Sequence, residues 1–214
     1  MKLMKTFLCL ALITGLFSCN QNSGNEDKNA NHDQESMNDS NSMENLNSIV
    51  VKSGGATIAK VSATPSEIWF SLRGKEYQSK LKGDKRKYAV KKGEITYEVK
   101  YKDDAFKVRT ASGDLLWKIK LYDDKVKISN NEENLNSYEI KKSNPDKYKL
   151  KKDENTLGEI ELKKSDRKVE IGSQNSHFEI ETDRIYLGYG ALLIDEIPED
   201  IRIIIMAELI AKDK

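Results

Sequence analysis

The chain has 214 residues, of which 33% are charged and 37% are hydrophobic. Its 36 basic and 35 acidic residues leave a formal net charge of +1, so bulk charge excludes a general nucleic-acid-binding protein. With two cysteines and two histidines, the sequence has too few residues for a structural zinc site or a disulfide framework. The composition is polar, but it is apolar enough to form one hydrophobic core.

The first 18 residues, MKLMKTFLCLALITGLFS, have the pattern of a secretory signal. Lys2 and Lys5 precede an apolar run from Phe7 to Phe17, which is shorter than the roughly 20 residues that a membrane-spanning helix needs. We therefore predict that residues 1–18 are a signal peptide that is removed from the mature protein.

The apolar run ends at Leu16, Phe17, Ser18 and Cys19. A small residue directly before a cysteine, with a leucine three positions before it, resembles the bacterial lipobox. The resemblance implies that the Cys19 thiol receives a diacylglyceryl group, that the signal is cleaved before Cys19, and that acyl chains such as palmitate anchor the protein in a membrane of the bacterial cell envelope. Asn20 stands where an aspartate would favour the inner membrane, so we expect the outer membrane. The alternative is an ordinary secretory signal with an incidental cysteine.

Residues 19–48 begin with Cys19 and continue as an asparagine-rich segment. Between residues 20 and 48 there are nine asparagines, six acidic residues and one lysine. Such a segment cannot bury enough apolar surface to offset its conformational entropy, so we expect a disordered tether. The remaining residues, 49–214, contain 33 basic and 29 acidic residues and are expected to form the folded domain.

From residue 49 onward the hydrophobic pattern has a period of two, which predicts strands with one buried and one wet face. Turn residues such as Ser112-Gly113-Asp114 separate the apolar runs. Early strands are expected at 48–52, 55–61, 67–72, 76–82 and 87–91. After them a hairpin of about 20 residues recurs. Its strand centres are Val99, Val108, Ile119, Ile128, Ile140, Leu150, Ile160, Ile171 and Ile180.

We estimate a total near twelve short antiparallel strands. Exposed strand edges can pair with other chains, and closure of the sheet into a barrel removes them. The predicted fold class is therefore mainly β, a closed or nearly closed antiparallel barrel built from hairpins.

The C-terminal segment has a different pattern. Pro198 and the two acidic residues after it suit the first turn of a helix, and from Ile201 onward only one arginine and one glutamate interrupt the apolar residues. A helix that is apolar all round must be surrounded, so we predict that it fills the barrel as the only candidate for that place. The predicted buried helix core is Ile201, Ile203, Ile204, Ile205, Met206, Leu209 and Ile210. The alternatives are a helix on one face of a β-sandwich and a last strand from Ile201 to Met206.

This order, many hairpin strands and then an apolar C-terminal helix, resembles the tubby C-terminal-like superfamily, which includes the LURP-one-related and phospholipid scramblase-like domains. The segments that carry the resemblance are WKIKLYDDKVKI at 117–128 and ALLIDEIPEDIRIIIMAELIA at 191–211. The resemblance covers residues 49–214 and implies a barrel threaded by a hydrophobic helix. Tubby proteins bind phosphoinositide headgroups through basic side chains, but the matching positions cannot be assigned in this sequence.

In residues 49–214 the only candidate functional site is a cluster of charged side chains. This part of the sequence contains one histidine, His177, and no cysteine. We therefore predict no catalytic residue, no metal and no cofactor. Between residues 73 and 92, nine basic residues accompany two acidic ones. The candidate anion-binding residues are Lys80, Lys82, Lys85, Arg86, Lys87, Lys91 and Lys92. The alternative is the solvated face of a hairpin, and because the nearby aromatic residues form no regular series, we expect no nucleic-acid partner.

Together these observations predict a non-enzymatic, lipid-anchored envelope protein whose barrel binds an anionic lipid or a protein partner in the envelope. One alternative is a structural or assembly lipoprotein without a small ligand. The other is an enzyme of a type that no motif reveals.

Overall fold

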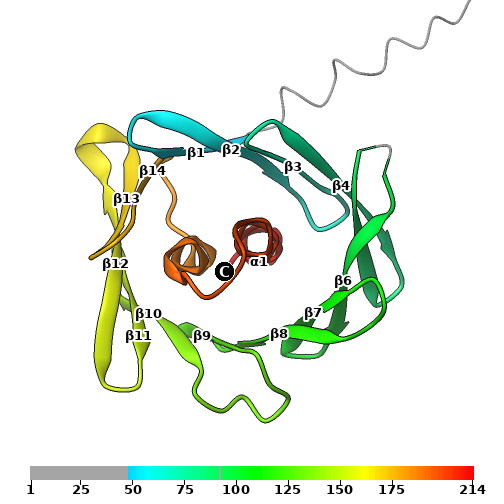
Figure 1. Cartoon of the computed structure of the whole chain (residues 1–214). Coiled ribbons are helices and arrows are strands. Elements are labelled where there is room, and N and C mark those ends of the chain that lie inside the picture. Colours follow the sequence, from blue (N-terminus) through cyan, green and yellow to red (C-terminus); the bar gives the residue numbers. More distant parts are fainter. Residues whose placement is uncertain (1–47, 92) are drawn as a thin grey trace, which may run out of the picture. The chain divides into compact units, whose positions relative to one another are not determined.

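Fourteen antiparallel strands form a closed barrel in the computed structural model, which describes residues 48–91 and 93–214 (Figure 1). The strands are β1 (Ile49–Ser53), β2 (Ala56–Ala63), β3 (Ile68–Leu72), β4 (Lys75–Lys82), β5 (Lys85–Val90), β6 (Ile95–Lys102), β7 (Ala105–Thr110), β8 (Leu115–Leu121), β9 (Lys125–Ser129), β10 (Tyr138–Asn144), β11 (Lys147–Lys152), β12 (Asn155–Lys163), β13 (Lys168–Ser173) and β14 (His177–Glu181). Each strand pairs with its neighbours in sequence, and β1 pairs with β14 to close the barrel.

Three helical segments complete the described chain. The short 3-10 helix η1 (Lys164–Asp166) joins β12 to β13. A second 3-10 helix, η2 (Leu187–Leu193), and the α-helix α1 (Glu199–Ala211) follow the last strand. The predicted signal peptide, Cys19 and the tether through residue 47 lie outside the described residues, as does Lys92.

The strand register follows from the period-two pattern. Val99 of β6 lies opposite Val108 of β7. Ile119 of β8 lies opposite Phe106 on one side and Ile128 on the other. All five side chains are completely buried. Because successive side chains of a strand point to opposite faces, the charged residues between them point outward, and the core lies inside the barrel.

Local signals mark where the elements begin and end. The predicted turn at Ser112–Asp114 joins β7 to β8, and Gly113 has a φ of 99° there, which glycine adopts without steric cost. Pro198 directly precedes α1, and the helix begins with Glu199 and Asp200. Acidic side chains in the first turn are favoured by the partial positive charge of the helix N-terminus.

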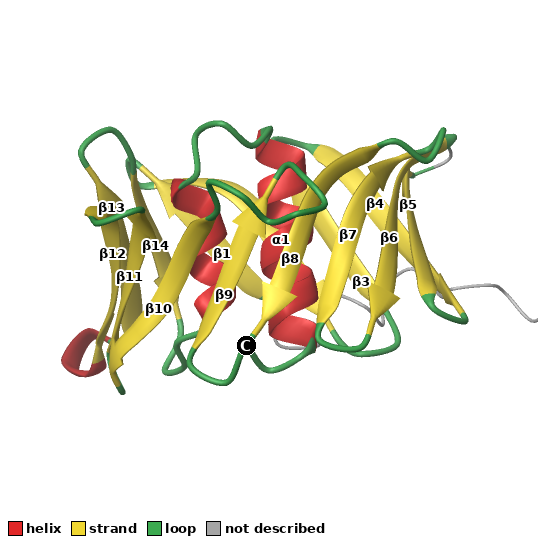
Figure 2. Ribbon diagram, turned by 90° about the horizontal axis from the view of Figure 1, so that it is seen from below, coloured by secondary structure: helices red, strands yellow, loops and turns green. Residues whose placement is uncertain are grey.

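The barrel and its interior helix are confirmed, but the strand count is fourteen rather than near twelve. Each predicted hairpin centre does lie in a strand, so the pattern was sound and the total was too low. The five early strands and the nine hairpin strands expected from the sequence already number fourteen, so the estimate near twelve undercounted them. A barrel widens as strands are added, and this one encloses η2 as well as α1 (Figures 1 and 2).

The C-terminal part of the chain fills the interior with two helical segments, because η2 lies there as well as α1. Every residue of η2, from Leu187 to Leu193, is buried. It packs against α1 and against β10–β13, whereas α1 packs against β2 and β3. Glycine makes this close approach possible. A Cβ on Gly188 would lie 2.8 Å from the Met206 carbonyl oxygen, and one on Gly190 would lie 2.8 Å from Ile140.

α1 lies inside the barrel, which excludes the β-sandwich and final-strand alternatives. Six of the seven predicted core residues are buried: Ile201, Ile203, Ile204, Ile205, Met206 and Leu209. Ile210 is half-buried, near the C-terminal end of the helix. In the part of the chain that the structure describes, no helix combines the length and the apolar character needed to cross a membrane.

Candidate anion-binding face

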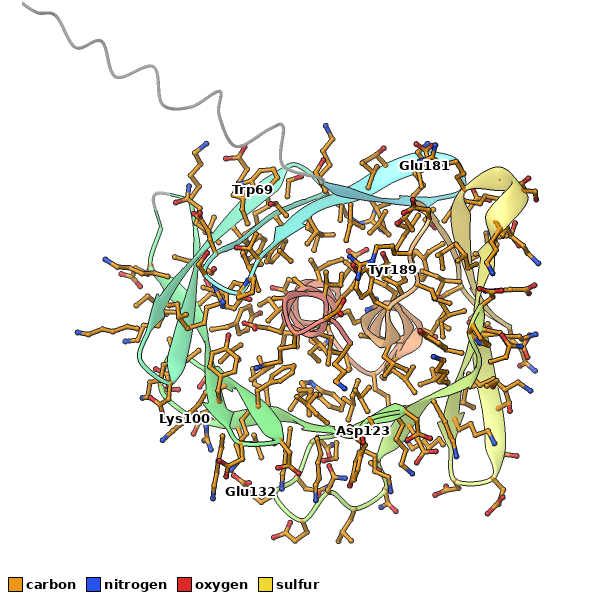
Figure 3. All side chains as sticks on the ribbon, turned by 180° about the vertical axis from the view of Figure 1, so that it is seen from behind. Trp69, Lys100, Asp123, Glu132, Glu181 and Tyr189 are labelled. Atoms are coloured by element: carbon orange, nitrogen blue, oxygen red, sulfur yellow. The ribbon has the colours of Figure 1, made fainter. Side chains whose placement is uncertain are left out.

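A row of lysines crosses the outer face of the barrel from β4 to β8. Each strand contributes one lysine, and each lysine lies directly opposite the next across the strand pairing. We call this set the lysine row: Lys82, Lys85, Lys100, Lys107 and Lys118. Figure 3 shows Lys100 pointing away from the barrel. The register that turns the apolar residues of β4–β8 inward therefore also collects these ammonium groups on one surface.

More basic residues flank the lysine row. Lys80 lies opposite Lys87, one position further along β4 and β5 on the same face. Over β6–β8 a groove of about 350 Å³ is lined by six basic side chains and by two acidic ones, Asp103 and Asp104. The basic side chains are Lys100, Lys102, Lys107, Arg109, Lys118 and Lys120. Like charges placed directly opposite on neighbouring strands repel, so this face is electrostatically strained unless anions neutralise it.

Carboxylates neutralise only part of this charge. Lys85 pairs with Glu98 at 3.0 Å, and Lys107 pairs with Glu132 at 2.6 Å. Among residues 48–91 and 93–214, Lys82 and Lys100 have no ion-pair partner. The lysine row is thus an excess of positive charge that is held in place by the sheet.

The structure brings together four of the seven candidates from the sequence: Lys80, Lys82, Lys85 and Lys87. Lys91 follows β5 and pairs with Glu76 at 2.7 Å, and Lys92 lies outside the described residues. Lys100, Lys107 and Lys118 belong to the row but are not among the candidates predicted from the sequence. The signal for them was the hairpin repeat, which places outward residues of successive strands opposite one another.

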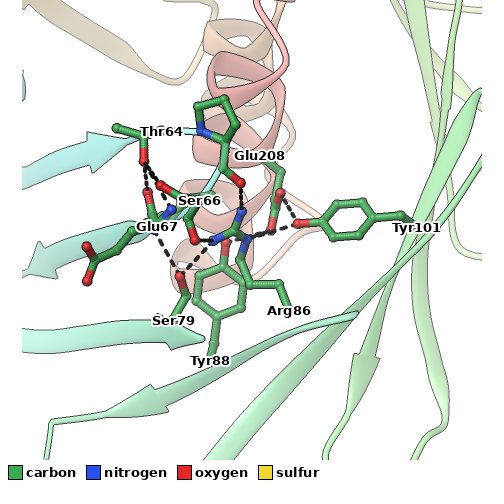
Figure 4. Close-up of polar contacts among 10 residues, drawn as sticks. Thr64, Ser66, Glu67, Ser79, Arg86, Tyr88, Tyr101 and Glu208 are labelled. Atoms are coloured by element: carbon green, nitrogen blue, oxygen red, sulfur yellow. Dashed lines mark hydrogen bonds and ion pairs between the residues drawn. The ribbon is translucent and has the colours of Figure 1, made fainter. Parts of the chain in front are cut away.

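Arg86 requires a correction, because it is only 2% exposed and points into the barrel. It alternates with Lys85 and Lys87 along β5, so the pleat turns it to the opposite face. Its guanidinium forms an ion pair with Glu208 of α1 at 3.2 Å (Figure 4). The guanidinium also donates to the carbonyl oxygens of Pro65 and Ser66 at 2.8 and 3.1 Å. Arg86 is therefore fully engaged inside the barrel and does not belong to the anion-binding face.

Glu208 is the acceptor at the centre of this interior contact. Tyr88 and Tyr101 each donate a hydrogen bond to its carboxylate at 2.7 Å, and Arg86 also donates from Nε to the Tyr101 hydroxyl at 2.9 Å. Burial raises the pKa of Glu208, while the hydrogen bond from Tyr101 and the charge of Arg86 act in the opposite direction. A buried charge of this kind is tolerated only when it is paired and hydrogen-bonded, so the contact fixes the depth of α1 in the barrel.

A second polar contact holds the other end of α1. Tyr97 donates to the Asp200 carboxylate at 2.8 Å, and Tyr77 donates to the same oxygen at 3.3 Å. Outside the barrel mouth, Arg73 binds Glu199 through two nitrogens at 2.9 and 3.0 Å. The strands that carry the lysines at the β4–β6 end of the face are thus attached from inside at both ends of α1.

Comparisons with known proteins add little to this geometry. No model of a known protein family matches the chain, and no curated protein matches it. One solved structure that it resembles is a protein from Arabidopsis thaliana, with 11% identity and a TM-score of 0.35. That match covers 71% of this chain and 93% of the plant protein.

Proposed function

We propose that this protein is a binding module that holds an anionic membrane surface against its lysine row. The observation that carries the proposal is the placement of five lysines directly opposite one another on five successive strands. With strands about 4.8 Å apart, the row is roughly 19 Å long along the curved wall of the barrel. A line of charge of that length suits an extended array of headgroups better than a single small anion.

The expected electrostatic contribution to the free energy of membrane binding is large enough to be measured. A lysine near an anionic membrane contributes about 1 kcal/mol at physiological ionic strength. Lys85 and Lys107 are already paired with carboxylates, so the other three lysines of the row give about 3 kcal/mol. The contribution falls with added salt, because exposed charges are screened beyond roughly 8–10 Å. Binding would also relieve the repulsion between the opposed lysines.

We further propose that the protein is a bacterial lipoprotein of the outer membrane, anchored through acyl chains on Cys19. The lipobox-like ending of the signal segment supports this proposal. Labelling with radioactive palmitate tests it, since the label should be lost in Cys19→Ser. The resemblance to the tubby C-terminal-like superfamily is likewise a proposal. Its support is the combination of a hairpin-built closed barrel with an apolar C-terminal helix inside.

A vesicle experiment with charge-reversal variants tests lipid binding. The full chain is incubated with phosphatidylcholine vesicles that contain either no phosphatidylserine or a substantial fraction of it, at sub-saturating lipid and low salt. One variant reverses the row in Lys100→Glu, Lys107→Glu and Lys118→Glu. The matched control reverses three outward lysines elsewhere, in Lys60→Glu, Lys141→Glu and Lys151→Glu. Because residues 1–47 are the same in every variant, differences in partition coefficient report the folded part of the chain.

We expect the wild type and the control to prefer phosphatidylserine vesicles and the row variant to lose about a hundredfold or more in partition coefficient, at about 1 kcal/mol per lysine. Equal losses in both variants would show that net charge, and not the row, governs binding. The absence of any preference in the wild type would end the lipid proposal. Thermal unfolding of each variant confirms that it is folded.

A further inference from the structure

A β-bulge exposes an isoleucine beside the lysine row. The pairing of β5 with β6 shifts between Tyr88 and Ala89, so that Tyr88 lies opposite Tyr97 while Ala89 lies opposite Ile95. One extra residue, Thr96, stands between the two pairs. A bulge of this kind re-aims side chains, and here it leaves Ile95 43% exposed on the outer face. In a regular ladder the position of Ile95 would have been occupied by Thr96.

The exposed isoleucine lines a groove that has one apolar part and one mainly basic part. The groove lies over β4–β6 and has a volume of about 730 Å³. Ala89 and Ile95 supply its apolar floor. The rest of the lining is polar and consists of Gln78, Ser79 and four lysines that we call the rim, Lys80, Lys82, Lys85 and Lys87. Lysine side chains cover apolar surface with their methylene stems while the ammonium stays in water, so the rim adds apolar area near the floor and positive charge above it.

The charge of the rim is mostly uncompensated. Lys85 has Glu98 at 3.0 Å, but Lys80, Lys82 and Lys87 have no ion-pair partner within the described ranges 48–91 and 93–214. Lys80 and Lys87 also lie directly opposite each other. The groove therefore offers an anion two or more ammonium groups at once, next to a strip of exposed aliphatic surface.

From this juxtaposition we propose that the groove binds a single anionic amphiphile, with its aliphatic chain on Ala89 and Ile95 and its acidic head between the lysines of the rim. This inference deepens the proposed function and rests on it, because the same face would meet the membrane. Charge complementarity selects an acidic head, and the apolar floor selects a chain. Because α1 and η2 fill the barrel interior, the aliphatic chain of the ligand would lie on the outer face of the barrel.

The test uses dodecyl phosphate below its critical micelle concentration, measured by isothermal titration calorimetry with the full chain. Two other probes separate the parts of the ligand. Inorganic phosphate has the head without the chain, and dodecyltrimethylammonium has the chain with the opposite charge. The floor is altered by Ile95→Asn. Its matched control is Leu157→Asn, which removes an equally large apolar residue that is 39% exposed on β12. The rim is altered by Lys80→Gln combined with Lys87→Gln.

We expect dodecyl phosphate to bind saturably and more tightly than either partial probe. Ile95→Asn should weaken it by about tenfold, as expected for losing part of the apolar contact area that the bound ligand would cover, and Leu157→Asn should leave it unchanged. The rim variant should abolish it. Dodecyl phosphate binding no tighter than inorganic phosphate, or equally in the two Asn variants, would overturn the inference.

This result and the vesicle result can be told apart. If anionic vesicles are preferred but dodecyl phosphate is not bound, the membrane proposal stands and the groove proposal fails. If vesicles show no preference although dodecyl phosphate binds through Ile95, the membrane proposal fails and the groove remains a site for a soluble amphiphile.

Discussion

The outer faces of β4–β8 and β11–β14 are built from the same kind of hairpin, but their charged side chains are arranged differently. On β4–β8 lysine lies opposite lysine across five strands. On β11–β14 each outward glutamate has a basic partner. Lys147 contacts Glu159 at 2.6 Å and Lys168 contacts Glu170 at 3.0 Å. Lys125, Lys141 and Lys149 also lie opposite one another over β9–β11, but each has a carboxylate within 4.0 Å. Opposed lysines therefore recur in this barrel, and the lysine row differs in that Lys82 and Lys100 have no ion-pair partner among the described residues.

The inner faces of the same two regions differ as well. β4–β6 present tyrosines and Arg86 to the carboxylates of Asp200 and Glu208. The inner residues of β11–β13 are mostly aliphatic and pack against η2. β4–β6 thus bind α1 through directional polar contacts, whereas the later strands contact η2 through complementary apolar packing. Three predictions test this comparison.

The largest effect is expected for Arg86→Met. It leaves the Glu208 carboxylate buried without its ion pair, and breaking such a pair costs about 3–5 kcal/mol in the free energy of unfolding. The neighbouring change Lys87→Met, on the outer face, should stay within about 0.5 kcal/mol. Chemical denaturation measures both, and adding Glu208→Leu to Arg86→Met should recover much of the loss. Equal stability of the two single variants would show that polar contacts do not hold α1.

A smaller effect is expected on the apolar side, for Gly190→Ala. The added Cβ would lie 2.8 Å from the buried Ile140 side chain, and overpacking of a core costs about 1–3 kcal/mol. Gly172→Ala is the control, because its nearest atom would be at 3.7 Å, an ordinary contact. Denaturation midpoints should separate the two variants. If they coincide, η2 is packed less tightly against β10 than the comparison requires.

The smallest effect concerns pH and the paired outer face. Hydrogen bonds from Lys147 and Lys168 lower the pKa of Glu159 and of Glu170. A lowered pKa in the folded state contributes stability above the ordinary value of about 4.3, and this contribution is lost as the pH falls through the lower folded value. Each exposed pair contributes about 0.2–1 kcal/mol.

The double variant Glu159→Gln and Glu170→Gln should therefore be slightly less stable at neutral pH and should lose less stability on acidification. Melting temperatures measured from about pH 7 down to about pH 3 show how steeply the stability of the wild type and of the double variant depends on pH. Parallel curves for the variant and the wild type would mean that these pairs contribute nothing.

Most of the fold could be predicted because its signals are local. Alternation of apolar and charged residues placed each strand, as with Val99 and Ile119, and turn residues placed the connections. The candidate face was predicted in part. Lys80, Lys82, Lys85 and Lys87 came from one hairpin, but the rest of the row required knowing which strands pair.

Arg86 shows why local charge was misleading. It belongs to the same basic run as its neighbours, yet it lies two residues from the buried Tyr88 on β5 and therefore shares the inner face with it. That spacing was visible in the sequence. The carboxylate that makes its burial tolerable was not visible as a partner, because Glu208 lies on a distant helix.

By itself the sequence determined the strands, the turns and the apolar C-terminal helix, since each depends on residues within a few positions of one another. Only the tertiary structure decided how many strands close the barrel, that η2 shares its interior, and which lysines lie opposite one another. These features depend on contacts between segments far apart in the chain, where volume, strand register and the pairing of buried charges must be satisfied together.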